Sequence, residues 1–390
     1  MKDLKDKLDT LCIFRDFLKD PVISALCKFL ENPTSPAYAG FVAVLYEANG
    51  GDLSAYIQEL CDNSSNVYVK TLGKGEPVPD HIYFALLSEL ETLQEVADLT
   101  KVKLCSLFTF PGFLPGFAGS KLHLKDHYLH RANNIEKYGY GIYAKNHMFY
   151  VDAQDKIVPV RNPDRIGISQ LVDYQRERQI IVDNTKALLS GKPAANILLT
   201  GDAGTGKSST VKAVANALWA NGLRLIEMRK DQLRAIPHIL DELSENPLKF
   251  VLFIDDLSFL KDDDNFNALK AVLEGSVTAK SSNVVIYATS NRRHIIKEKF
   301  SDRDGDDVHR NDTMQELISL SERFGIHVTF SKPNKQTYLH IVHSIAQEHG
   351  LEIPDQELDA QAERFALERG GRSARLARQF VDGLLAKIDT

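Results

Sequence analysis

Residues 201–209 read Gly-Asp-Ala-Gly-Thr-Gly-Lys-Ser-Ser, a complete phosphate-loop pattern of the form G-x-x-x-x-G-K-[ST]. The apolar run 196–200 before it is short, favours β-structure and leads into a glycine. The Ala-rich segment 211–220 after it has the spacing of a helix. The loop therefore lies where a strand becomes a helix, and this predicts an α/β fold that binds a nucleoside triphosphate.

The glycines of this loop let the backbone turn tightly, so that N–H groups and the following helix N-terminus converge on the phosphates. Lys207 adds a positive charge, and Ser208 offers its hydroxyl to a Mg²⁺ ion between the β- and γ-phosphates. We expect the phosphates to contact the whole loop, namely Gly201, Asp202, Ala203, Gly204, Thr205, Gly206, Lys207, Ser208 and Ser209.

Two acidic residues follow the apolar segment 249–254, which has the composition of a buried strand. Ligands of α/β folds collect at the carboxyl ends of the strands, so Asp255 and Asp256 are expected at the nucleotide. Asp255 is expected to hold Mg²⁺ directly or through water, and Asp256 to act as the base for the attacking water. A glutamate more often takes the second role, and aspartate is one methylene shorter.

The next strand, predicted at 283–289, ends in further polar residues. Asn291 is the first candidate to hydrogen-bond the γ-phosphate and the water, and Thr289 and Ser290 are the alternatives. If no nucleotide role applies, an asparagine at a strand end is an ordinary turn residue.

Arginines occur at two later positions where they could act on a phosphate. Arg323 precedes the apolar strand 326–330 at the edge of the sheet, and an arginine there can reach the γ-phosphate of a neighbouring subunit. The alternative is a surface ion pair with a nearby acid. Arg375 or Arg372, in the C-terminal segment, could return to the nucleotide from a helical lid; otherwise they belong to a solvated helix face.

The alternation of elements suggests three parts. Residues 1–165 are expected to form a mostly helical domain that includes a small β-meander at 138–160. Residues 166–332 alternate strands and helices, which predicts a three-layer αβα domain with a parallel sheet. Residues 333–390 are expected to form a small helical lid.

Composition narrows the class of protein. The chain has 390 residues, of which 43% are hydrophobic and 26% charged, with a net charge of −6, as in globular proteins. Its cysteines are widely spaced and lack a C-x-x-C pair, which argues against a zinc site or a disulfide framework: Cys12, Cys27, Cys61 and Cys105. No signal peptide or membrane span is recognisable, so we expect a cytoplasmic protein without a membrane partner.

The motifs together resemble those of an AAA+ ATPase, in the order phosphate loop, acidic pair, polar strand end, edge arginine and lid arginine. Four strings resemble more closely the bacterial AAA+ family filed as domain of unknown function 815: Gly204-Thr-Gly-Lys-Ser-Ser209, Asp255-Asp-Leu-Ser-Phe259, Tyr287-Ala-Thr-Ser-Asn-Arg-Arg-His294 and Leu320-Ser-Glu-Arg-Phe-Gly325. The resemblance covers roughly residues 165–385. It departs at Asp173, where the family usually has a glycine, next to the adenine pocket expected around Leu171 and Val172.

The resemblance implies an ATPase with Mg²⁺ as cofactor that forms a homo-oligomeric, hexamer-like ring or spiral, with Arg323 acting on the neighbouring subunit and Arg375 as the lid sensor. Such an ATPase would remodel a protein or nucleoprotein partner recognised by residues 1–165. A nucleotide-gated binding module with little hydrolysis is one alternative. A helicase-loader-like ATPase that contacts nucleic acid is another.

Two further groups of residues allow functional interpretations. The basic segment 227–234, with Arg292, Arg293, Lys297 and Lys299, could follow a nucleic-acid backbone, although a solvated helix face is the simpler interpretation. His123, His127 and His130 share a helix face and could bind a metal, but they lack a complete ligand set. A GTP-specific switch is not expected, because the N-K-x-D motif that reads guanine is missing.

Overall fold

The computed structural model describes residues 2–257, 264–274, 282–291 and 322–388. Contacts divide the chain into two compact units. The N-terminal unit comprises Met1–Lys145 and Asn246–Leu248, and the second unit comprises Asn146–Glu245 and Lys249–Thr390.

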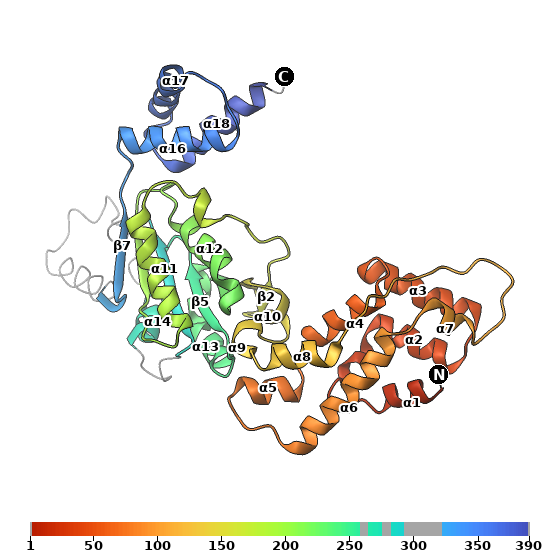
Figure 1. Cartoon of the computed structure of the whole chain (residues 1–390). Helices are drawn as coiled ribbons and strands as arrows, with labels where there is room; N and C mark the ends of the chain where they lie inside the picture. The colour runs from red at the N-terminus through yellow and green to blue at the C-terminus, as the bar shows by residue number, and fades with distance from the viewer. Residues whose placement is uncertain (1, 258–263, 275–281, 292–321, 389–390) are drawn as a thin grey trace. The chain divides into compact units, whose positions relative to one another are not determined.

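The N-terminal unit is helical and is built around one hydrophobic core (Figure 1). Several of its helices begin at a polar side chain that accepts a hydrogen bond from the first turn, as Asp20 does for α2 and Asn66 for α5. Its helices are α1 (Lys2–Asp9), α2 (Pro21–Glu31), α3 (Ser35–Asn49), α4 (Leu53–Asp62), α5 (Val67–Gly73), α6 (Asp80–Ala97), α7 (Lys101–Cys105), α8 (Leu124–Ala132), α9 (Ile135–Tyr138) and α10 (Ile142–Lys145).

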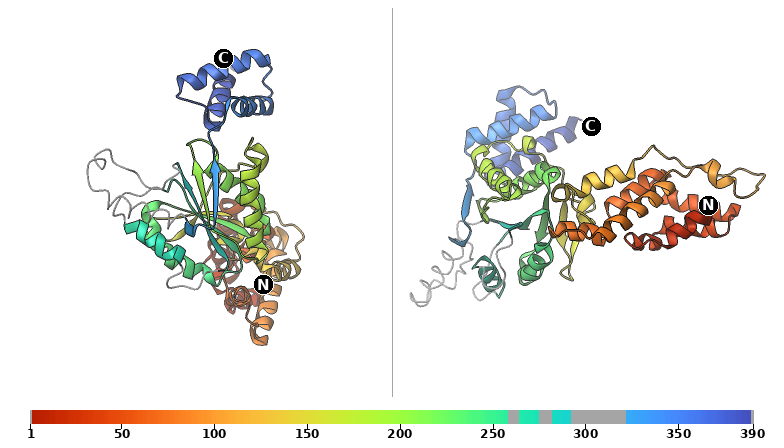
Figure 2. Two further views of the ribbon diagram at one scale, coloured as in Figure 1. Left: turned by 90° about the vertical axis from the view of Figure 1, so that its left-hand side faces the viewer. Right: turned by 60° about the horizontal axis from the view of Figure 1, so that its bottom comes forward.

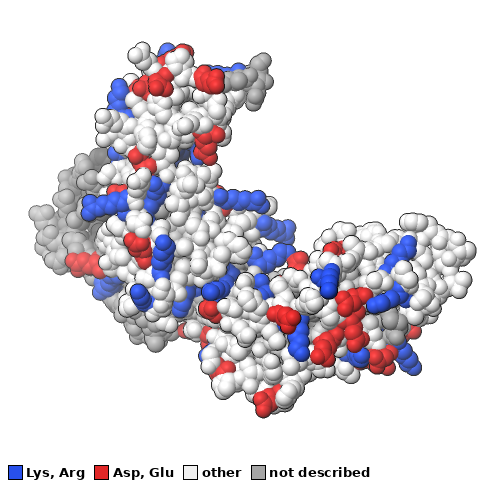
Figure 3. All heavy atoms as spheres, in the orientation of Figure 1, with Lys and Arg blue, Asp and Glu red and all other residues white. Residues whose placement is uncertain are grey.

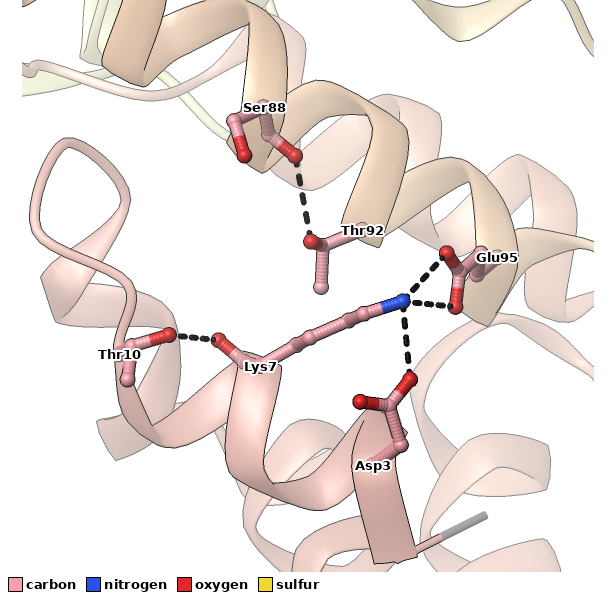
Figure 4. Close-up of polar contacts among 6 residues, drawn as sticks. All are labelled: Asp3, Lys7, Thr10, Ser88, Thr92 and Glu95. Carbon is pink, nitrogen blue, oxygen red and sulfur yellow. Dashed lines mark hydrogen bonds and ion pairs between the residues drawn. The ribbon is translucent and has the colours of Figure 1, made fainter.

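Two carboxylates of α6 hold the N-terminal segment. Glu89 is buried and accepts hydrogen bonds from the backbone N–H groups of Ile13 and Phe14. Glu95 pairs with Lys7 of α1 at 3.0 Å, and Lys7 also reaches Asp3 (Figure 4). The oxygens of the buried Glu89 carboxylate accept from backbone donors. Glu89 therefore stabilises the turn after α1 more than the exposed Glu95–Lys7 ion pair does.

The second unit contains a seven-stranded sheet with the strand order β2-β1-β4-β5-β6-β3-β7. All neighbouring strands are parallel except β1 and β2, which are antiparallel. The strands are β1 (Met148–Val151), β2 (Ile157–Pro159), β3 (Ile197–Gly201), β4 (Leu223–Met228), β5 (Lys249–Ile254), β6 (Val284–Ser290) and β7 (Ile326–Phe330). The β4–β7 positions agree closely with the strands predicted from the sequence.

Helices cover both faces of this sheet, which confirms the predicted three-layer α/β class (Figure 2). The apolar sides of α11 (Gln175–Leu189) and α12 (Lys207–Leu218) pack on one face, with Ile181 and Val214 among the buried residues. Helices α13 (Ile236–Ser244) and α14 (Asp264–Glu274) lie on the other face.

The C-terminal helices form a small bundle, as predicted for the lid. Helices α16 (Lys335–Glu348), α17 (Asp355–Glu368) and α18 (Ala374–Ile388) enclose their own apolar core, in which Tyr338 and Val381 are fully buried. Val172, from the segment before α11, packs against this core.

The structure differs from the expected domain boundary at residue 165. The antiparallel pair β1–β2 is present, but β1 also pairs in parallel with β4, so Phe149 lies opposite Ile226. The two strands therefore extend the nucleotide-domain sheet instead of closing the N-terminal domain, and the division falls after Lys145. Within the described residues, no helix has the length and apolar character needed to cross a membrane.

Candidate nucleotide-binding site

A cavity of about 600 Å³ lies at the carboxyl ends of the central strands, where the register brings β3, β5 and β6 to one edge. The phosphate loop and the ends of β5 and β6 line one part of it. The segment before α11 and the lid helices line the rest. Its size is in the range typical of small-molecule sites.

The loop glycines are required by the backbone. Gly201, Gly204 and Gly206 have φ values of 136°, 77° and 90°, which are conformations that residues with a side chain rarely adopt. A Cβ atom on Gly201 would lie 2.0 Å from the carbonyl oxygen of Phe330 at the end of β7. The turn that presents the loop N–H groups to a phosphate thus depends on the absence of these side chains.

Lys207 is buried, with 5% of its surface exposed, and its ammonium group points back into the loop. It donates to the carbonyl oxygens of Gly201 and Asp202 at 2.9 and 2.8 Å, and to Oδ1 of Asn291 at 3.0 Å. Burial lowers the pKa of Lys207, and nearby carboxylates, Asp255 first, oppose the shift. The hydrogen-bond acceptors of this buried ammonium are neutral oxygens. A negatively charged phosphate bound beside it would therefore stabilise its charge.

Ser208 and Asp255 meet as the sequence predicts. The Ser208 hydroxyl donates to Oδ1 of Asp255 at 2.6 Å, and the hydroxyl of Thr289 donates to the same oxygen. A hydroxyl and a carboxylate are hard oxygen ligands, and Mg²⁺ is commonly held by one or two such groups together with phosphate oxygens. The residues present therefore fit a Mg²⁺ ion, which Ser208 and Asp255 would hold.

Asp256 has a left-handed backbone, with φ at 53°, and its carboxylate is exposed to the cavity. Its N–H donates to Oγ1 of Thr289 at 2.9 Å, and its Oδ1 accepts from Nδ2 of Asn291 at 2.7 Å. Oδ1 of the same carboxamide accepts from Nζ of Lys207, so Asn291 links the loop lysine to the candidate base. The structure thus brings together Lys207, Asp256 and Asn291.

The segment before α11 forms the other end of the cavity. Leu171 and Val172 line it, as expected for an adenine pocket. Asp173 and Tyr174 follow with φ values of 59° and 56°, so both residues have a left-handed backbone conformation. The glycine usual at position 173 suits this conformation, and aspartate is among the few other residues that tolerate it. The departure from the family pattern therefore leaves the backbone turn intact.

Two contacts hold this segment in place. The buried guanidinium of Arg178 donates to the carbonyl oxygen of Leu171. The hydroxyl of Tyr174 donates to the carbonyl oxygen of Ser331 at 2.6 Å, and burial raises the pKa of Tyr174 to about 12. The tyrosine is therefore a neutral donor throughout the ordinary pH range.

The two lid arginines differ in position. Arg375 lines the cavity, and its backbone N–H donates to the carbonyl oxygen of Gly204 at 3.2 Å. Arg372 is not among the lining residues and makes a two-pronged contact with Glu363 of α17, at 2.8 and 2.6 Å. The geometry therefore favours Arg375 as the lid arginine at the nucleotide and does not bring Arg372 to it.

Arg323 is also outside the cavity lining, because it precedes β7, whose opposite end, Phe330, faces the phosphate loop. Arg292, Arg293, Lys297 and Lys299 lie outside the described residues. In the segment 227–234, Arg229 pairs with Asp231 at 3.0 Å, which reduces the charge expected to face a nucleic acid.

His123, His127 and His130 lie on or just before α8, and His127 pairs with Asp62 at 2.9 Å. Throughout the described ranges, no group of three or more His, Cys, Asp or Glu side chains is placed to hold a metal ion.

Some cavity residues could not be found from the sequence. Ile341 and Ile345 of α16 supply an apolar wall, and Arg378, Gln379 and Asp382 of α18 line the cavity beyond Arg375. The spacing of 375, 378, 379 and 382 marks one helix face. That pattern could have shown that the four residues share one face of the helix, but not that this face lines the cavity.

A comparison with protein families matches the region that contains this cavity. The family model described as "Protein of unknown function (DUF815)" matches residues 144–388, more than half of the chain. No curated protein sequence matches significantly.

Among solved structures, one mutant of RuvB from Thermotoga maritima aligns with a TM-score of 0.39 and 14% identity, over 57% of this chain and 67% of that chain. Another mutant of the same protein aligns with a TM-score of 0.38 and 16% identity, over 55% of this chain and 63% of that chain. The alignments thus span about two thirds of the RuvB chains or slightly less.

Proposed function

The chain belongs to the DUF815 family, and we propose that it binds ATP in the cavity between the sheet and the lid and hydrolyses it in a Mg²⁺-dependent reaction. The observation that carries this proposal is the convergence of Lys207, Asp255, Asp256 and Asn291 through direct hydrogen bonds at the phosphate loop. These residues come from three different strand ends and share one cavity.

The chain's own groups suit a phosphoryl transfer to water. The loop N–H groups and Lys207 bind the phosphates, and Ser208 and Asp255 hold Mg²⁺, which when bound neutralises charge on the β- and γ-phosphates. Asp256 accepts a proton from a water whose oxygen attacks the γ-phosphorus, while the bond to the ADP oxygen breaks and its electron pair leaves with ADP. Asn291 orients the water or the γ-phosphate after releasing Lys207.

Arg323 supports a further part of the proposal, an oligomer in which each subunit completes its neighbour's site. It lies at the amino end of β7, away from the phosphate loop of its own chain. We propose that the N-terminal unit recognises the protein or nucleoprotein partner that the ATPase remodels. In the second unit, the Arg229–Asp231 pair weakens the helicase-loader alternative.

One observation favours the slower, nucleotide-gated version of the function. Oδ1 of Asp256 accepts from Nδ2 of Asn291 at 2.7 Å, so only Oδ2 of the short candidate base is left to take a proton in this arrangement. If that contact persists with ATP bound, the protein exchanges partners with nucleotide state and hydrolyses ATP only slowly. A turnover above about 1 s⁻¹, within the usual enzyme range, would exclude this version.

The test compares Asp256→Asn with Lys207→Ala. Asp256→Asn keeps the size of the side chain, so it should bind a fluorescent ATP analogue with near wild-type affinity while phosphate release falls about a hundredfold or more. Lys207→Ala should lose both binding and hydrolysis. Asp183→Asn, a change on α11 outside the cavity lining, is the control and should alter neither. Undiminished hydrolysis by Asp256→Asn would remove Asp256 from the proposed reaction.

A further inference from the structure

The N-terminal unit exposes large apolar side chains in one short stretch of chain. Phe113 is 87% exposed, Val102 is 79% exposed and Phe110 is 43% exposed. Pro111 and Gly112 lie between the two phenylalanines and are exposed as well. We call residues 109–117 the Phe113 loop. An aromatic ring held almost entirely in water is costly, and such groups commonly mark an interaction site.

The Phe113 loop is held by contacts of the residues that follow its tip. The hydroxyl of Tyr38 donates to the carbonyl oxygen of Pro115 at 2.8 Å, and Nζ of Lys101 donates to that of Leu114 at 2.6 Å. The Phe117 ring packs on Phe41 at a centroid distance of 5.7 Å. The exposed rings therefore sit on a fixed support, so little conformational entropy is lost when they are buried by a partner.

In the sequence segment that contains the loop the charge is of one sign, although in the structure Lys125 pairs with Glu91 at 3.6 Å. From Leu99 to Lys125 the sequence contains no Asp or Glu, although the whole chain has 53 acidic residues and a net charge of −6. The same segment contains four lysines: Lys101, Lys103, Lys121 and Lys125. In Figure 3, white spheres cover the end of the N-terminal unit at the right of the view, and both blue and red side chains lie beside them. The apolar tip is thus accompanied by positive charge and selects an anionic partner.

We propose that the Phe113 loop docks on the surface of an anionic lipid bilayer, with Phe110, Phe113 and Val102 entering the interface and the neighbouring lysines facing the headgroups. This combination of apolar side chains and lysines is the one that favours binding at an anionic membrane surface. No spanning helix is needed, so the docking is compatible with a chain whose described helices cannot cross a bilayer. It differs from the sequence-based expectation of no membrane partner.

Nucleic acid is the competing anionic partner, and the loop fits it less well. Stacking on bases needs open aromatic faces, whereas the Lys101 ammonium lies 5.5 Å from the centroid of the Phe113 ring. Val102 and Pro111 offer neither a stacking face nor a hydrogen-bond donor to a base or a phosphate. In a bilayer the same residues are buried with the rings.

The experiment measures co-sedimentation of the full chain with large vesicles of phosphatidylcholine containing phosphatidylglycerol, against vesicles of pure phosphatidylcholine. The wild type should bind the anionic vesicles, and high salt should weaken binding. Phe113→Ser should lower the partition coefficient about tenfold or more, since burying a phenylalanine ring contributes on this scale. The matched control is Phe84→Ser, which removes an aromatic ring that is 65% exposed on α6, outside the acid-free segment. It should bind as the wild type does.

A fluorescence measurement gives an independent readout. Trp219 is the only tryptophan, so Phe113→Trp in a Trp219→Phe background reports the loop alone. Its emission should shift to the blue with anionic vesicles and stay unchanged with pure phosphatidylcholine.

Three results would overturn the proposal. The first is equal sedimentation of the wild type and Phe113→Ser with anionic vesicles. The second is binding of a single-stranded oligonucleotide that Phe113→Ser abolishes while vesicle binding is absent. The third is a change in oligomeric mass caused by Phe113→Ser without vesicles, which would make the loop a contact between copies of the chain. None of these outcomes depends on the nucleotide chemistry.

Discussion

Thr289 connects the two acidic residues at the end of β5 through a single hydroxyl group. It donates to Oδ1 of Asp255 and accepts from the N–H of Asp256 at 2.9 Å. The residue is 2% exposed, so water cannot easily replace its hydroxyl. The metal ligand and the candidate base thus share one positioning side chain, which the sequence offers only as an alternative to Asn291.

We expect Thr289→Val to slow ATP hydrolysis more than it weakens ATP binding. Valine has nearly the same shape but leaves the Asp256 N–H only its longer contact with Oδ1 of Asp255, at 3.2 Å, and removes one donor from Asp255. The loss of such a hydrogen bond costs about 1–3 kcal/mol. Turnover should fall about tenfold to a hundredfold, while the affinity for a fluorescent ATP analogue changes little.

Thr289→Ser is the matched control, because it keeps the hydroxyl and should retain most of the turnover. The positioning role would be wrong if valine preserved turnover, or if serine and valine were equally impaired.

Asp173 departs from the expected sequence pattern, and its backbone conformation shows the structural consequence. Its φ of 59° explains the glycine usual at this position, and its carboxylate adds a contact that glycine cannot make, with His340 of α16 at 3.1 Å. The sequence identified the unusual residue, but its consequence depended on a dihedral angle and on a partner 167 positions away. Neither can be read from local pattern.

At the level of elements, α18 illustrates which part of the site the sequence could not resolve. Arg372 and Arg375 are close in sequence, so either could be the lid sensor. The structure separates them through Glu363 of α17, which holds Arg372 in two hydrogen bonds and leaves Arg375 at the cavity. The phosphate loop, by contrast, was predictable because its function is contained in nine consecutive residues.

Substitutions at the two arginines should therefore have different effects. Arg375→Ala should weaken ATP binding or slow hydrolysis about tenfold or more, since it removes a charge beside the phosphate loop. Arg372→Ala should instead loosen the packing of α17 and α18, and Glu363→Gln should reproduce its effect. The measurements are steady-state ATP hydrolysis and hydrogen exchange of the lid helices.

The assignment fails if Arg372→Ala impairs hydrolysis as strongly as Arg375→Ala while lid exchange is unchanged.

The main difference between the expected and the observed structure lies at the edge of the sheet, where β1 and β2 belong to the second unit. Alternation of residue types indicates strands such as β1 and β2, and the turn residues between them indicate their antiparallel pairing. The parallel pairing of Met148 with Leu225 joins segments far apart in the sequence, and no local pattern records it. Strand existence was therefore predictable, whereas the neighbour of β1 was not.

This pairing predicts how the chain can be shortened. A fragment of residues 146–390 keeps β1 and β2, whereas a fragment of residues 166–390 removes them and exposes the edge of β4. Buried β1 residues such as Phe149, 1% exposed, would be lost with it. We expect the longer fragment to be soluble and protease-resistant and the shorter one to aggregate, because an open apolar edge strand promotes association.

Both fragments lack residues 1–145 and the contacts of these residues with 246–248, so the fragments differ only in residues 146–165, which contain β1 and β2. Equal solubility and equal resistance to limited proteolysis would show that the two strands are dispensable.

At the level of the whole molecule, the direction of β7 determines what Arg323 can reach. The strand starts at Ile326 and ends at Phe330, which pairs with Gly201 of the phosphate loop. A strand of this length spans about 16 Å, so Arg323 lies at the opposite end of the strand from its own loop. Under the proposed function, we therefore expect Arg323 to contribute to hydrolysis at the site of another copy, as in a head-to-tail ring or spiral.

Mixing two inactive variants tests this sharing directly. Arg323→Ala should reduce hydrolysis by a factor of about 10³ or more, and Asp256→Asn should also be nearly inactive. In a mixed oligomer, a subunit with intact Asp256 can lie beside one with intact Arg323, and random assembly from equal amounts gives this arrangement at about a quarter of the sites. The mixture should therefore recover about a quarter of the wild-type rate of phosphate release. The recovery should grow with protein concentration, since it requires assembly. If the mixture hydrolyses no more ATP than its separate components, although light scattering shows mixed oligomers, then Arg323 does not act on a neighbouring site.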